Sequence, residues 1–66
     1  MSKLIIEIET ENAAFEYNTE GEVNRILDNI KNNINYDYLI ACGVTVGLKD
    51  INSNTVGTIK GVKDNV

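Results

Sequence analysis

Three glutamates alternate near the N-terminus of this 66-residue chain, at positions 7, 9 and 11. On one β-strand their side chains would share a face about 6.6–6.8 Å apart, because a strand rises about 3.3–3.4 Å per residue. Such a row of carboxylates could imitate nucleic-acid phosphates and occupy a basic groove on another protein. The alternative is a solvated face that keeps an edge strand from aggregating. Glu7, Glu9 and Glu11 are therefore candidate protein-binding residues.

Asp50, Asn52 and Asn54 have the spacing of ligands in a calcium loop. Such a loop needs glycine at its sixth position and a bidentate glutamate at its twelfth, where this chain has Thr55 and Gly61. An asparagine-rich hairpin turn explains the same residues, because Asp and Asn side chains bond to nearby backbone. The sequence therefore predicts a turn here and no metal site.

Catalytic chemistry has little support in the sequence. Cys42 is the single cysteine, and the chain has no histidine to activate it, so we expect it to be buried in a strand. Paired carboxylates would need a concave site that separates their pKa values, and one thin layer of sheet and helix offers little concavity. We therefore expect a binding protein with no catalytic residues and no cofactor.

The three tyrosines are further candidates for binding. Tyr36 and Tyr38 stand at strand spacing on either side of Asp37, and Tyr17 lies in a connection where its hydroxyl could reach water. Tyrosine is a favoured anchor at protein interfaces. Packing at the edge of the chain's own core would explain Tyr36 and Tyr38 equally well. Tyr17, Tyr36 and Tyr38 join the glutamates as predicted protein-binding residues.

The elements that position these groups follow from hydrophobic periodicity. Residues 3–10 alternate as a strand, with Leu4, Ile6 and Ile8 facing the core and Ile5 on the carboxylate face. Phe15, in the connection that follows, is expected to close one end of the core.

A helix follows this connection. Thr19 and Glu22 have the form of a capping box at its start. Apolar residues then recur with helical spacing in one stripe: Val23, Ile26, Leu27, Ile30 and Ile34.

The C-terminal half returns to strand periodicity. Residues 43–51 and 54–62 predict a β-hairpin, and residues 38–42 either begin its first strand early or form a short strand. The order is β-α-β-β. We expect one α+β domain, residues 1–66, with one amphipathic helix on a three- or four-stranded, mainly antiparallel sheet whose other face is uncovered.

Size and charge restrict the partners. All of the net charge of −4 falls within residues 1–35, and no basic stripe exists, so we expect no direct nucleic-acid binding. The longest uncharged stretch, residues 38–48, is too short to span a membrane, and no signal peptide fits, so we expect a cytoplasmic protein.

The small core that a chain of 66 residues can bury suggests a second subunit. Ile5 and Ile51 look misplaced for a monomer and are the predicted homodimer interface.

Three blocks of the sequence stand out: residues 6–16 contain IETENAAFE, residues 22–27 read EVNRIL and residues 48–57 read LKDINSNTVG. They resemble a family of short, mostly uncharacterised phage and prophage proteins, whose members open with an "IET-(D/N)-NAAFE" stretch, continue with "E-(V/I)-x-RIL" and end with an "L-x-D-x-N-G-N-x-V-G" hairpin. This chain has Glu11 where Asp or Asn is usual and Ser53 where glycine is usual. Residues 36–47 have no counterpart.

The resemblance implies a phage setting, in which small proteins often block a host system. We therefore expect a stoichiometric inhibitor of a host anti-phage defence protein, acting in the host cytoplasm through its acidic and aromatic surface. One alternative is a sponge that sequesters a small nucleotide signal in a dimer, for which basic residues would have to converge: Arg25, Lys49, Lys60 or Lys63. Another is a structural or assembly module of the phage.

Overall fold

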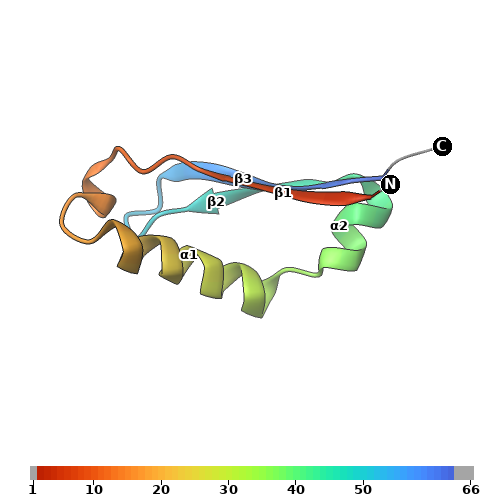
Figure 1. Cartoon of the computed structure of the whole chain (residues 1–66), viewed down its shortest axis with the longest axis horizontal. Helices are drawn as coiled ribbons and strands as arrows, with labels where there is room; N and C mark the ends of the chain where they lie inside the picture. The colour runs from red at the N-terminus through yellow and green to blue at the C-terminus, as the bar shows by residue number, and fades with distance from the viewer. Residues whose placement is uncertain (1, 64–66) are drawn as a thin grey trace.

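The computed structural model describes residues 2–63, which form two α-helices on one face of a three-stranded antiparallel sheet (Figure 1). In chain order the elements are β1 (Lys3–Ile8), the 3-10 helix η1 (Ala13–Phe15), α1 (Thr19–Asn33), α2 (Tyr36–Cys42), β2 (Thr45–Lys49) and β3 (Thr55–Val62). The predicted α+β class and the three-stranded sheet are confirmed. The second helix is an addition to the predicted order.

β3 is the central strand and pairs antiparallel with β1 on one side and β2 on the other. Its pairing with β2 confirms the predicted hairpin, although the register shifts between Leu48 and Lys49. Ile59 lies opposite Ile6 of β1 and Val46 of β2, so the three side chains share the face that the helices cover. β1 and β2 are the two edges of the sheet.

The core lies between this face and the helices, and most elements contribute to it: Phe15, Ile26, Ile30, Leu39, Leu48, Val56 and Ile59 are its buried apolar residues. Phe15 is buried as predicted. β1 contributes less than expected. Leu4 and Ile6 lie on the core side of the sheet but remain 37% and 42% exposed, because β1 is an edge strand. Only Ile8 of the predicted trio packs against the core.

The N-cap of α1 is Asn18, one residue before the predicted cap. Asn18 precedes the helix with a non-helical backbone, and its Oδ1 accepts a hydrogen bond from the Gly21 amide over 2.9 Å. The prediction that Thr19 caps the helix is wrong, because its hydroxyl instead donates to the Phe15 carbonyl over 2.8 Å. Ile26 and Ile30 are buried as the apolar stripe predicts, and Ile34 follows the last helical residue.

Residues 38–42 belong to α2, so the prediction of a strand there is wrong. Asn35 caps the helix by accepting from the Tyr38 amide over 3.1 Å, and Gly43 ends it with a φ of 63°, which favours glycine. The two caps define the helix, and its geometry carries Leu39 into the core. α2 lies across Gly61 of β3, where a Cβ atom would overlap the Leu39 carbonyl.

Candidate protein-binding surface

The segment between β1 and α1, the first residues of α1 and the β2–β3 turn meet at one end of the molecule, on the left in Figure 1. We call this the loop end and define it as residues 9–22 and 50–54. Asp50 is its centre and is only 4% exposed. Its Oδ1 accepts from the amides of Asn52 and Asn54 over 2.8 and 2.9 Å, and its Oδ2 accepts from Asn12 Nδ2 over 2.6 Å. The predicted asparagine-rich turn is confirmed, and Asp50 also fastens it to the segment before η1.

A second buried carboxylate fastens α1 to the same turn. Glu22 is 7% exposed and accepts from Arg25 Nε over 2.7 Å and from the Ile51 amide over 2.9 Å. Arg25 also donates to the Lys49 carbonyl over 3.0 Å. Segments that are distant in the sequence are therefore held together by charge-assisted hydrogen bonds.

Both carboxylates are stabilised in their charged forms. The hydrogen bond from Arg25 lowers the pKa of Glu22 below its ordinary value, against the opposing effects of burial and of the nearby Asp50 charge. Burial acts to raise the pKa of Asp50, but hydrogen bonds from Asn54, Asn12 and Asn52 together lower it. Among residues 2–63, every buried side-chain nitrogen and oxygen has a partner. These groups therefore serve as a scaffold for the surface around them.

The predicted row of three glutamates is interrupted, because β1 ends at Ile8. Glu7 lies on the strand, whereas Glu9 and Glu11 lie in the segment that leads to η1 and line an open hollow beside Thr55. The Glu9 amide still donates to the Val56 carbonyl over 2.7 Å. Glu9 and Glu11 therefore belong to the loop end, and Glu7 belongs to the sheet.

The predicted aromatic residues separate into two groups. Tyr17 is 94% exposed at the loop end, where Ile51 is also 66% exposed. Tyr36 and Tyr38 lie in the first turn of α2, beyond the 15 residues of α1, which span about 22 Å at about 1.5 Å per residue. Being two residues apart on a helix, they point in different directions and do not share a face as on a strand.

The predicted interface residues are also separated. Ile5 lies in the middle of β1 opposite Lys60, on the sheet face away from the core, whereas Ile51 lies in the β2–β3 turn.

The prediction that Cys42 is buried in a strand is wrong, because its side chain is exposed at the end of α2. Arg25, a candidate for anion binding, is already engaged by Glu22.

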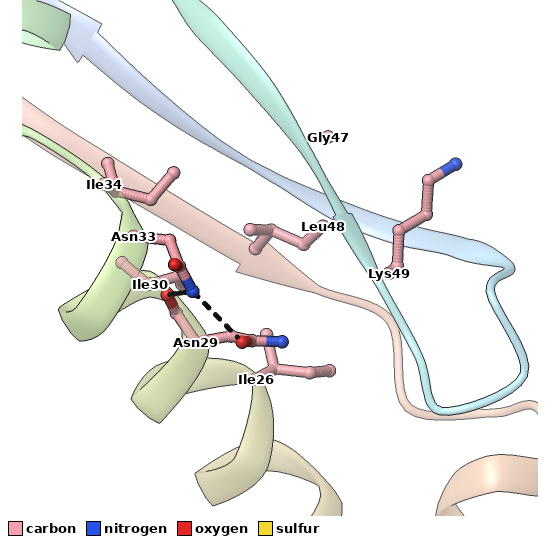
Figure 2. Close-up of a pocket in the computed structure, with 8 residues that line it drawn as sticks. All are labelled: Ile26, Asn29, Ile30, Asn33, Ile34, Gly47, Leu48 and Lys49. Atoms are coloured by element: carbon pink, nitrogen blue, oxygen red, sulfur yellow. Dashed lines mark hydrogen bonds between the residues drawn. The ribbon is translucent and has the colours of Figure 1, made fainter.

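A separate groove of about 220 Å³ lies between α1 and β2 (Figure 2). The sequence alone does not predict it, because it depends on how the helix lies against the sheet edge. Two asparagines and four apolar side chains line it together with Gly47 and Lys49: Ile26, Asn29, Ile30, Asn33, Ile34 and Leu48. Asn33 Nδ2 donates to the Asn29 carbonyl over 3.0 Å, and Lys49 extends away from the helix in Figure 2. The groove offers apolar contact beside an edge strand.

Residues 2–63 contain no group of three Cys, Asp or Glu side chains that could hold a metal ion. Within the same residues, neither helix has the length and apolar character needed to cross a membrane. Comparison of the chain with protein-family models, with curated proteins and with solved structures gives no match.

Proposed function

We propose that this protein is a stoichiometric binding protein that docks its loop end on a basic surface of a partner protein. The observation that carries the proposal is the 94% exposure of Tyr17, beside a scaffold whose buried polar groups are satisfied. Ile51 adds a second exposed hydrophobic side chain at the same end. Aromatic side chains on a fixed backbone are frequent anchors of protein interfaces, because ordering them costs little entropy.

Negative charge around Tyr17 and Ile51 favours a partner with a basic surface. Four exposed glutamates belong to the loop end: Glu9, Glu11, Glu16 and Glu20. Within residues 2–63, the ion pair at this end joins Arg25 to Glu22 and involves none of these four carboxylates. An acidic surface accelerates encounter with a basic partner and disfavours an acidic one.

The resemblance to small phage proteins supports a partner in a host defence system. The blocks that carry it also supply the scaffold of the loop end: Asn12 comes from the first block, Glu22 and Arg25 from the second, and Asp50 from the third. The anion site required by a nucleotide sponge has less support, because Arg25 is engaged by Glu22 and the Lys49 carbonyl.

The test is capture of partners by tagged protein from nuclease-treated lysate of a low-GC bacterium, read by mass spectrometry. We expect wild type to retain one stoichiometric basic protein. Tyr17→Ala should lose it without a change in thermal stability, because the Tyr17 side chain is almost fully exposed. Tyr38→Ala, which removes an exposed tyrosine from α2, is the matched control and should retain it.

A charge series tests the acidic component. Glu9→Gln combined with Glu11→Gln should weaken capture and its sensitivity to salt. Asp28→Asn combined with Asp37→Asn removes two exposed carboxylates from the helices and should have little effect. Equal capture by all these variants would show that the loop end is not the binding surface.

A further inference from the structure

β1 is an exposed edge with apolar residues on both faces. Leu4 and Ile6 are more than one-third exposed although they lie on the core side of the sheet, and Ile5 lies on the other side. Native edge strands are normally protected by charge, shortness or a bulge. The other edge, β2, is interrupted where its register against β3 shifts between Leu48 and Lys49, whereas β1 carries charge only at Lys3 and Glu7, on the face away from the core. β1 is regular over its six residues.

The backbone of β1 has groups free for pairing. The Glu9 amide donates to the Val56 carbonyl, so in the regular register the N–H and C=O groups of Glu7, Ile5 and Lys3 also face β3. The Gly61 amide donates to Val44, which fixes the same alternation on β3. The backbone groups of Leu4, Ile6 and Ile8 must therefore point outward from the sheet.

We propose that β1 pairs antiparallel with β1 of a second copy of this chain, about a two-fold axis at Ile5. Leu4 of each copy then lies opposite Ile6 of the other, and each such pair exchanges both backbone hydrogen bonds through the outward groups. The two three-stranded sheets become one continuous sheet, and Leu4 and Ile6 cover each other.

Charge complementarity selects this register. With the axis at Ile5, Lys3 of each copy lies opposite Glu7 of the other, on the face that also holds Ile5. An axis at Leu4 would place Ile5 opposite Lys3, and an axis at Ile6 would place it opposite Glu7. The axis at Ile6 would also bring Lys3 opposite Glu9, which lies beyond the end of β1, but it leaves Ile5 opposite a charge. Only the axis at Ile5 pairs opposite charges within β1 and pairs Ile5 with its own copy, and such cross-strand pairs favour association.

The first test reverses these charges. Lys3→Glu or Glu7→Lys alone creates two like-charge pairs, and we expect each to weaken dimerisation roughly ten-fold or more by sedimentation equilibrium. The double variant should restore it, and an equal mixture of the two single variants should form a heterodimer. A monomeric wild type throughout the concentration series, or single variants that dimerise as wild type does, would overturn the proposal.

The second test locates the axis. In a Cys42→Ser background, Ile5→Cys should form an intermolecular disulfide under mild oxidation. Cα atoms of a non-hydrogen-bonded pair lie about 4.5 Å apart, within disulfide range. Thr58→Cys, on the same face of the central strand, is the matched control and should not cross-link. A wild-type dimer with no cross-link through Ile5→Cys would assign a different interface. The tests do not depend on the loop end, so either proposal can fail alone.

Discussion

At the scale of single residues, Ser53 has a backbone conformation that L-residues rarely adopt. It is the one non-glycine residue of 2–63 with a positive φ, 68°, and its amide donates to the Asp50 carbonyl over 3.0 Å to close the turn. The left-handed region costs an L-residue about 1–2 kcal/mol. Glycine avoids this cost but loses more entropy on folding.

We therefore expect Ser53→Gly to raise the free energy of unfolding by about 0.5–1 kcal/mol, measured by urea denaturation. Ser53→Ala is the control, because it removes the hydroxyl and keeps the unfavourable φ. Its stability should not increase. A gain in Ser53→Ala equal to that in Ser53→Gly would exclude the backbone as the cause.

At the scale of elements, the sequence predicted those with enough residues to display a period. Six residues of β1 and fifteen of α1 reveal alternation and a helical stripe. The seven residues of α2 make fewer than two full turns, and the apolar run within them also suits a strand. Asn35 and Gly43 are the residues that could have indicated a helix here, as its N-cap and C-cap. Each is also common in turns, so only the pair at this separation favours a helix.

The packing of α2 depends on the missing side chain at Gly61. A Cβ atom there would overlap the Leu39 backbone, which cannot move without displacing α2. We expect Gly61→Ala to cost about 3 kcal/mol or more, a large share of the roughly 3–10 kcal/mol expected for this chain length. Gly47→Ala is the matched control on β2, because its Cβ would meet only a Thr55 methyl at 3.7 Å. It should be neutral or stabilising by up to about 1 kcal/mol. Equal effects in thermal unfolding would contradict this account.

At the scale of the whole molecule, the loop end could be predicted only in part. The asparagine-rich turn and, to within one residue, the start of α1 could be predicted, because each depends on neighbours in sequence, although the capping residue is Asn18 and not Thr19. The long-range hydrogen bonds that join the two could not be predicted. Glu22 reaches the Ile51 amide across 29 residues, and Asn12 reaches Asp50 across 38. Glutamates early in a helix usually suit its dipole and remain solvated, so burial of Glu22 had no local signal.

The hydrogen bonds accepted by the Glu22 and Asp50 carboxylates predict that the stability of the fold depends on acid pH. The ordinary pKa values are 4.5 for Glu22 and 3.8 for Asp50, and both are lowered in the folded protein. The unfolded chain therefore binds more protons as acid is added, so this part of the stability is complete above about pH 4.5 and is lost as the pH falls through the folded values. We expect the urea midpoint of wild type to fall steeply below this point.

Asp50→Asn should lower the urea midpoint at pH 7 and flatten its acid dependence, because the Asn12 amide loses its charged acceptor and one titrating group is removed. Glu20→Gln, which removes an exposed carboxylate from the same turn of α1 as Glu22, should keep the wild-type profile. Equal flattening by both substitutions would assign the acid dependence to general charge repulsion. Flattening by Asp50→Asn alone would assign it to the contacts that fix the loop end, and would link the rigidity of the proposed binding surface to pH.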